Sequence, residues 1–231
     1  MNKTKNSEMK KGFFVRRQNR FVAEVEIDGQ VERCHVKNTG RLRELLVPGV
    51  EVFCEVHDEP ERKTKFSLVL VKKGERLVSI DSQAPNKAAY DYVAAGGLGG
   101  VPSALRREVV HGDSRFDLFF ELNGRPSFLE VKGVTLEQDG VARFPDAPTE
   151  RGSKHLRGLQ RAVREGFDAY VLFVVQMQGV SCFVPNDAAD PVFGKTLREA
   201  AKNGVRVLAV CCDVSEDGVK IAAPIPVRLE L

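Results

Sequence analysis

Residues 115–135 read RFDLFFELNGRPSFLEVKGVT, and no other segment of the chain combines chemistry-bearing residues so closely. Apolar residues alternate with others in residues 115–122 and again in residues 127–132, as in half-buried strands. Between the two runs, Asn123-Gly124 is typical of a tight turn. The segment therefore predicts a β-hairpin.

If the loop has an even number of residues, the apolar side chains of this hairpin lie on one face; they are Phe116, Leu118, Phe120, Leu122, Leu129 and Val131. A two-residue loop at Asn123-Gly124 sets Asp117 opposite Glu130, whereas a four-residue loop sets Asp117 opposite Lys132. In both registers Asp117, Glu130 and Lys132 point the same way. Two nearby carboxylates repel each other unless a cation lies between them, and a hard divalent cation is the usual partner. The pattern predicts a metal site, with a cross-strand ion pair as the alternative.

The composition is that of an ordinary globular protein. With 231 residues, 42% hydrophobic and 29% charged, the chain can form one large or two modest domains. The net charge of +3 is too small to indicate nucleic acid, although basic residues cluster at 10–20, 62–73 and 151–164. Five cysteines lack any Cys-x-x-Cys, and there is no N-terminal or long apolar run. These features predict buried thiols in a reducing, cytoplasmic setting, and no membrane segment.

The N-terminal half alternates short strands with turns. Strands are expected at residues 13–16, 20–27, 31–36, 50–56, 66–72 and 77–80. This many short strands favours a small closed barrel, with an oligonucleotide-binding (OB) fold as the candidate, over residues 12–80. Residues 81–102 follow as a linking helix around 85–95 and a glycine-rich hinge at 96–100.

The C-terminal half, residues 81–231, predicts an α/β domain with a mixed sheet. Thr149 begins a helix that runs to about Glu165, with a core stripe at Gly152, Leu156, Leu159 and Val163, and basic residues at Lys154, Arg157, Arg161 and Arg164. Residues 170–175 and 205–212 read as buried strands, and residues 191–202 as a further helix.

Asp117, Glu130 and Lys132 have the chemistry needed to cleave a phosphodiester. Magnesium is bound by one or two carboxylates, the phosphate and several waters, and it makes water more nucleophilic. Lys132 could orient that water or stabilise developing charge. Glu108 would be a further acidic member if residues 105–110 pack beside the hairpin.

Two other segments could hold a phosphate backbone. Arg151, Lys154 and His155 lie in the first turn of the helix that Thr149 begins, where the helix dipole favours anions. The alternative is that Thr149 is only an N-cap and that the basic residues are solvated. In residues 34–42, Asn38-Thr39-Gly40 could form a phosphate-binding nest flanked by Lys37 and Arg41, or an ordinary loop that caps a helix.

These segments together resemble the sugar fermentation stimulation protein family. The resemblance is carried by His35 with Asn38-Thr39-Gly40, by residues 114–117, by residues 130–136 and by residues 144–156 (FPDAPTERGSKHL). It implies an OB-like barrel, a C-terminal domain similar to the PD-(D/E)xK nucleases, and DNA binding. Carried onto this chain, the nuclease-like site would be Asp117, Glu130 and Lys132, with Glu108 upstream. Phe116 replaces the expected proline, and Val36-Lys37 replaces a Cys-Pro pair.

We therefore expect a DNA-binding protein whose C-terminal site binds Mg²⁺ or Mn²⁺ and hydrolyses phosphodiesters. Asp117 and Glu130 would hold the ion with help from the Val131 carbonyl, while Arg151, Lys154, Arg157 and Arg161 would contact the backbone. A non-catalytic DNA-binding regulator and a protein-interaction module are the alternatives. No small-molecule cofactor is expected, and the oligomeric state is left open, a homodimer included.

Overall fold

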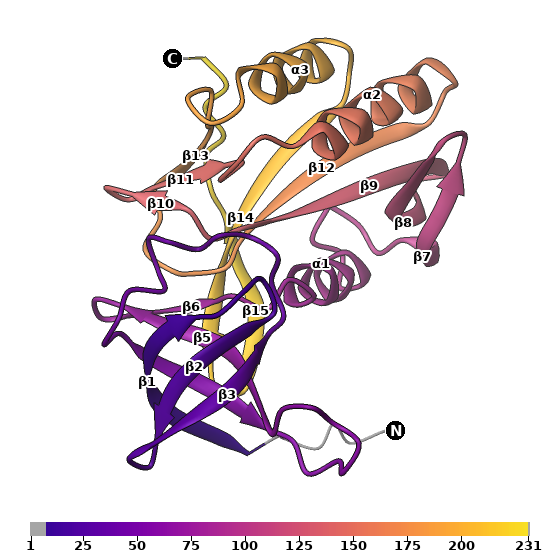
Figure 1. Ribbon diagram of the computed structural model, residues 1–231. Helices are drawn as coiled ribbons and strands as arrows, with labels where there is room; N and C mark the ends of the chain where they lie inside the picture. Colours follow the sequence, from indigo (N-terminus) through magenta and orange to yellow (C-terminus); the bar gives the residue numbers. More distant parts are fainter. Residues whose placement is uncertain (1–7, 231) are drawn as a thin grey trace.

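The computed structural model describes residues 8–230. Its N-terminal part is a barrel of antiparallel strands in the order β3-β2-β1-β4-β5-β6, drawn in indigo and purple (Figure 1). The strands are β1 (Met9–Arg17), β2 (Val22–Ile27), β3 (Gln30–Val36), β4 (Glu51–Val56), β5 (Phe66–Lys73) and β6 (Arg76–Ser79). β3 also pairs in parallel with β5, which closes β1–β5 into a five-stranded barrel. The predicted OB-like barrel is confirmed.

The C-terminal part is built on a mixed six-stranded sheet in the order β15-β14-β12-β9-β8-β7. Its strands are β7 (Ser103–His111), β8 (Ser114–Leu122), β9 (Arg125–Val134), β12 (Asp168–Val175), β14 (Arg206–Ser215) and β15 (Gly218–Pro224). The central strands β9, β12 and β14 are parallel, and the outer strands are antiparallel to their neighbours. This is the mixed sheet that the sequence predicts.

Three helices cover the two faces of this sheet (Figure 1). They are α1 (Ala84–Ala94), α2 (Glu150–Arg164) and α3 (Pro191–Lys202). α1 packs on β9, β12 and β15, whereas α2 packs on the other face, with α3 beside it. Thr149 caps α2, since its hydroxyl accepts a hydrogen bond from the Gly152 N–H. The site described below lies where the first turns of α1 and α2 approach the same end of β9.

The central hairpin has the shorter of the two predicted loops. Leu122 pairs with Arg125, so the loop is Asn123-Gly124, and both residues have the positive φ that this turn requires. One prediction is wrong. Phe116 does not share a face with Leu118, because Phe116 packs in the core beneath α2 while Leu118 packs in the core beneath α1. Strict alternation is interrupted at Asp117, which bonds to the backbone of β9 instead.

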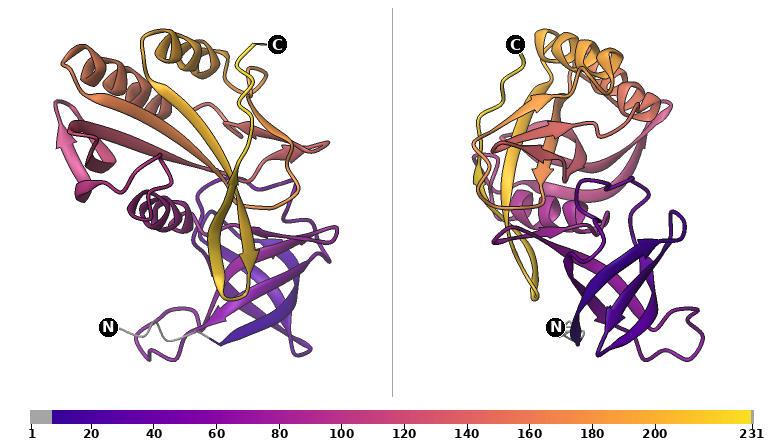
Figure 2. Two further views of the ribbon diagram at one scale, coloured as in Figure 1. Left: turned by 180° about the vertical axis from the view of Figure 1, so that it is seen from behind. Right: turned by 60° about the vertical axis from the view of Figure 1, so that its left-hand side comes forward.

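Strand β7 was not predicted from the sequence, and neither were two further parts of the fold. A small sheet of β10 (Glu137–Gln138), β11 (Val141–Phe144) and β13 (Cys182–Pro185) lies beside the main sheet. β14 also runs beyond Cys212 and forms a hairpin with β15 that reaches alongside the barrel, drawn in yellow in Figure 2. Val214 of this hairpin packs on Phe53, Val69 and Leu70 of the barrel. The two parts of the protein are therefore in contact through a β-ribbon.

Two expectations concern the whole chain. In the part that the structure describes, no helix has the length and apolar character needed to cross a bilayer. The five cysteines are free thiols; four are buried, and Cys211 is only half-buried. The prediction of buried thiols is therefore correct for four of them.

A buried carboxylate holds the two parts together. Glu137 of β10 is 4% exposed, and its carboxylate accepts hydrogen bonds from Lys73 of β5 and Arg76 of β6, at 2.5 Å and 3.2 Å. The Gly140 N–H donates to its other oxygen at 2.6 Å. Burial by itself would raise the pKa of Glu137, but Lys73 and the Gly140 N–H hold that pKa below its usual value.

Replacing Glu137 by glutamine should lower the free energy of unfolding by about 2 kcal/mol, because two cations lose a charge-assisted partner. Urea denaturation at pH 7 measures this loss. Since the folded pKa of Glu137 is lowered, its contribution is complete above about pH 4.3 and is lost as the pH falls further, through the folded pKa. Glu75→Gln is the control, because Glu75 is exposed on the neighbouring turn and forms no ion pair within residues 8–230. Equal free energies of unfolding for Glu137→Gln and Glu75→Gln would contradict the stabilising role of the Glu137 carboxylate.

Candidate metal and nucleic-acid site

The predicted metal-binding residues meet at one end of the central sheet. Asp117 comes from β8, Glu130 and Lys132 from β9, and His155 from the first turns of α2. They line a cavity of about 300 Å³. The other residues that line it are Ser82, Pro85, Asn86, Glu108, Arg115, Phe116, Val131, Gly133 and Arg151. The three side chains that the hairpin pattern selected therefore share one cavity.

Asp117 is held by backbone and side-chain donors. One carboxylate oxygen accepts the Val131 N–H at 2.7 Å, and the other accepts the Asn86 amide of α1 at 2.9 Å. Burial and the nearby charge of Glu130 nevertheless raise the pKa of Asp117 above its usual value. The ionised form of Asp117 is therefore under-stabilised in this arrangement.

Glu130 is almost fully enclosed, at 3% exposure. Its Oε1 accepts a hydrogen bond from the Lys132 ammonium at 2.7 Å and also contacts His155 Nδ1. Burial would raise the pKa of Glu130, but the His155 contact and the Lys132 charge hold that pKa below its usual value. Its Oε2 is buried and finds no hydrogen-bond partner among residues 8–230. A buried carboxylate oxygen without a partner is costly and needs an explanation.

A divalent cation fits this arrangement. It would neutralise the repulsion between Asp117 and Glu130 and would satisfy Glu130 Oε2. In the described part of the chain, no group of three or more His, Cys, Asp or Glu side chains is placed to hold a metal ion. A two-carboxylate set nevertheless suits Mg²⁺, which retains several waters and binds substrate phosphate. The role of the Val131 carbonyl stays a prediction.

The other predicted residues lie at different distances from the cavity. Glu108 of β7 lines it beside Asp117, but its side chain is 66% exposed and lies 3.9 Å from Arg115. Arg151 also lines it, and its Nε donates to His155 Nε2 at 3.5 Å. Residues predicted to contact DNA but lying outside the cavity are Lys37, Arg41, Lys154, Arg157 and Arg161.

Most of these outlying basic residues already have acidic partners. Lys154 and Arg161 of α2 both pair with Asp113, in the turn between β7 and β8. Lys37 bonds to Glu55 at 2.8 Å and lies 3.6 Å from Asp81. Their contribution to DNA binding stays a prediction.

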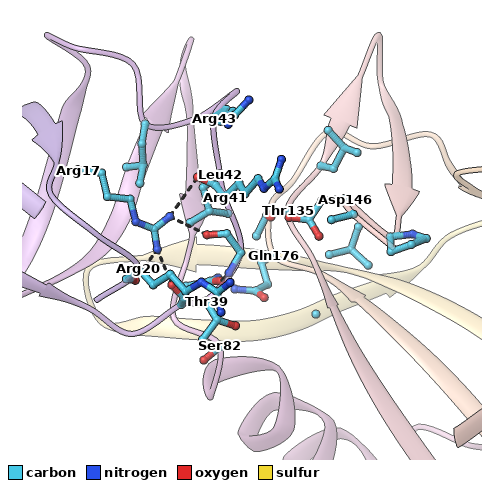
Figure 3. Close-up of a pocket in the computed structure, with 18 of the residues that line it drawn as sticks. Arg17, Arg20, Thr39, Arg41, Leu42, Arg43, Ser82, Thr135, Asp146 and Gln176 are labelled. Carbon is cyan, nitrogen blue, oxygen red and sulfur yellow. Dashed lines mark hydrogen bonds between the residues drawn. The ribbon is translucent and has the colours of Figure 1, made fainter. Parts of the chain in front are cut away.

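A larger cleft, of about 1000 Å³, lies between the barrel and the C-terminal domain and is drawn in Figure 3. Six arginines line it within the described chain: Arg16, Arg17, Arg20, Arg41, Arg43 and Arg143. Asp146 is the one acidic residue among the described lining residues. Ser82 and Gly133 border both this cleft and the cavity of Asp117 and Glu130, so the two spaces adjoin. We call it the arginine cleft.

The loop at Asn38-Thr39-Gly40 forms one wall of the arginine cleft. Arg17 donates to the backbone carbonyls of Asn38, Gly40 and Arg41, as Figure 3 shows. The Gly40 N–H donates to Asn38 Oδ1 at 2.7 Å, so this N–H is already occupied and not free for a phosphate nest. The loop leads into a turn and not into a helix. Arg41 and Arg43, which follow this loop, line the cleft.

Sequence reasoning did not identify the arginine cleft. Arg16, Arg17 and Arg20 were recognised as a basic cluster, but Arg43 and Arg143 were not singled out. His155 was grouped with the DNA contacts, although the structure buries it against Glu130. Helical spacing could have shown this, because position 155 is three residues after Gly152 and four before Leu159, both on the core stripe.

Asp117→Asn should abolish metal binding without unfolding the protein. Mg²⁺ at 100 times its Kd should stabilise the native chain by about 2.7 kcal/mol, and a thermal melt measures the shift. The asparagine variant should show no Mg²⁺-dependent rise, because one of two anionic ligands is gone. Asp113→Asn is the control, since Asp113 is an exposed carboxylate paired with Lys154 and Arg161. If Mg²⁺ raises the melting temperature of Asp117→Asn as much as that of Asp113→Asn, then the ion binds elsewhere.

A closed OB barrel joined to a mixed α/β domain defines a two-domain class of protein, and comparison with known proteins identifies its family. Residues 15–80 match the SfsA N-terminal OB domain, and residues 83–218 match the sugar fermentation stimulation protein RE domain. The chain belongs to the sugar fermentation stimulation protein family.

Relatives match it over nearly their whole length. The sugar fermentation stimulation protein homolog of Clostridium beijerinckii is 51% identical over 211 residues, which covers 91% of this chain and 93% of the relative. The homolog of Desulfitobacterium hafniense is 48% identical over 225 residues, covering 97% and 98%. The solved structure of Pyrococcus furiosus SfsA in complex with Ca²⁺ matches with a TM-score of 0.87 and 28% identity, covering 99% of this chain and 98% of the other.

Proposed function

We propose that this protein binds DNA and hydrolyses its phosphodiester bonds at the cavity of Asp117, Glu130 and Lys132, with Mg²⁺ or Mn²⁺ as the cofactor. The observation that carries the proposal is the buried, unpartnered Oε2 of Glu130, in the same cavity as Asp117 and beside the arginine cleft. An oxygen-lined cation position next to a polybasic cleft suits a phosphate backbone.

Each side chain has a definite task in this reaction. Asp117 and Glu130 would hold the ion, which when bound supplies charge neutralisation at the phosphate and a more nucleophilic water. The water oxygen forms the new P–O bond and loses one proton, one bond between phosphorus and a sugar oxygen breaks, and that sugar oxygen takes up one proton, so the protons balance. Lys132, which donates to Glu130 Oε1, would orient the water or stabilise charge that develops on the phosphate. His155 fixes the orientation of the Glu130 carboxylate.

Two further facts support the proposal. The hairpin with Asp117, Glu130 and Lys132 has the residue order of the PD-(D/E)xK nucleases, which the sequence resembles. The relative from Pyrococcus furiosus was solved with Ca²⁺, which like Mg²⁺ prefers oxygen ligands. A cytoplasmic location would give the protein access to DNA.

A non-catalytic DNA-binding regulator is the second candidate. Lys132 and His155 both contact Glu130 Oε1, which is what a buried structural ion pair would also do. In that case the arginine cleft would bind DNA while the cavity only stabilised the fold.

A titration with Mg²⁺ and Mn²⁺ separates the two candidates. Purified protein is incubated with labelled single-stranded, duplex and branched DNA, and both cleavage and binding are measured. The proposal expects metal-dependent cleavage of at least one substrate, abolished by EDTA. Binding without cleavage at any metal concentration would favour the regulator.

A further inference from the structure

A third space borders the cavity of Asp117 and Glu130, and Ser82 lines this space, the cavity and the arginine cleft alike. It has a volume of about 1090 Å³ and lies between the barrel, α1 and the turn of the β14–β15 hairpin. Asn86, Glu108 and Asp117 line both this space and the smaller cavity. We call it the acidic groove. The site therefore adjoins two larger spaces.

The charges of these two spaces are opposite. Seven acidic and two basic side chains among the described residues line the acidic groove: Glu55, Asp81, Asp91, Glu108, Asp117, Glu216 and Asp217, with Lys87 and Arg107. Lys37 offsets Glu55 and Asp81, and Lys87 lies 3.4 Å from Asp91. Glu216 and Asp217 are exposed at the hairpin turn and form no ion pair within the described chain. The acidic character of the groove therefore concentrates on its far wall, at the β14–β15 turn.

The opposite charges of the two spaces affect where a nucleic-acid strand can bind. Its phosphates are attracted along the arginine cleft, where Arg16 pairs with Glu24 but Arg20, Arg41 and Arg43 form no ion pair within the described chain. Within the acidic groove, the same phosphates would meet Glu216 and Asp217, which form no ion pair within the described chain, and Glu108, which lies 3.9 Å from Arg115. Like charges placed opposite each other suppress binding, so a strand that continues through both spaces is disfavoured.

We infer that this site acts on strand ends. This inference rests on the proposed nuclease function and names its substrate class: a linear DNA strand that lies in the arginine cleft, with its end at the site and few nucleotides beyond. The products would be mononucleotides or short oligonucleotides released from one end. A covalently closed circle offers no end and would have to pass through the acidic groove.

A circular single-stranded DNA and a linear oligonucleotide of the same sequence test the inference. With Mg²⁺ or Mn²⁺, the linear strand should be shortened from one end, and the circle should be cut at least about 100-fold more slowly. Labels at the 5′ and 3′ ends, on separate strands, show which end is used. Cutting of the circle within about threefold of the linear strand would overturn the inference and leave the nuclease function standing. Absence of cleavage on both DNAs would overturn both.

A charge-reversal variant tests whether the acidic residues at the β14–β15 turn are the reason that a circle is cut slowly. Glu216→Lys with Asp217→Lys should raise cutting of the circle at least about tenfold, with little change on the linear strand. The control is Glu61→Lys, in the loop between β4 and β5, because Glu61 is exposed and lines neither the acidic groove nor the arginine cleft. An unchanged ratio of circular to linear cutting in the double variant would contradict the role of the acidic groove.

Discussion

Replacing Lys132 by methionine will reduce DNA cleavage by about 10²- to 10⁴-fold, the usual effect of removing a group that assists proton transfer or stabilises transition-state charge. Methionine keeps much of the apolar stem, and the lysine side chain is only 12% exposed, so packing should change little. The ammonium lies 2.7 Å from Glu130 Oε1, in the cavity where the scissile phosphate would bind. Its loss therefore removes a positive charge at the reacting atoms.

DNA affinity should be nearly unchanged in this variant, because Lys132 lies outside the arginine cleft. Binding is measured with Ca²⁺ or without metal, and cleavage with Mg²⁺, on the same labelled strand. Lys195→Met is the matched control, since Lys195 is 79% exposed on α3 and lines neither the arginine cleft nor the cavity of Asp117 and Glu130. Equal losses of cleavage and affinity in Lys132→Met would assign Lys132 to binding. An unchanged rate of cleavage would show that Lys132 takes no part in the reaction.

The elements that were predicted correctly carry local signals. Alternation and Asn123-Gly124 defined the central hairpin, and Thr149 marked the first turn of α2. The continuous apolar run at residues 170–175 became β12, which has buried residues on both faces. In each case neighbouring residues in the sequence were sufficient to specify the structure.

The elements that were missed depend on contacts between distant residues. The β14–β15 hairpin has exposed polar residues at its turn, and its apolar residues pack on distant elements: Val219 and Ile221 on the core beneath α1, and Val214 on that core and on the barrel. Phe116 left the predicted face because Asp117 bonds to the Val131 N–H of β9. The arginine cleft draws on Arg17, Arg43 and Arg143, which only the folded chain brings together.

The candidate site was predictable for a different reason. Asp117, Glu130 and Lys132 lie on one hairpin, and its even two-residue loop brings the three into one cavity. His155 joins them from α2, and only the packing of that helix on the sheet shows that it contacts Glu130. The surroundings of the site, which decide what can reach it, are tertiary and were not visible in the sequence.

Changing Arg20, Arg41 and Arg43 together to glutamine will weaken binding to single-stranded DNA by about 100-fold at 0.1 M salt. Each phosphate contact contributes about 0.7 to the slope of log K against log[salt], so the loss of three contacts changes the slope by about 2. Because 0.1 M is tenfold below the 1 M reference, this change in slope corresponds to about a 100-fold loss of affinity at 0.1 M salt. All three side chains are exposed on the arginine cleft, and none forms an ion pair with a residue that the structure describes. Their charges are therefore available to phosphate.

A second triple variant carries the same loss of charge elsewhere. Lys154, Arg157 and Arg161 of α2, changed to glutamine, should weaken binding less, because Lys154 and Arg161 already pair with Asp113. Both triples are titrated with DNA at several salt concentrations, and the two slopes are compared. If the α2 triple lowers the slope more than the cleft triple, then the strand follows α2 and not the arginine cleft. If both slopes equal that of the unmodified protein, DNA binds on neither surface, because phosphate contacts cannot be removed without reducing counterion release.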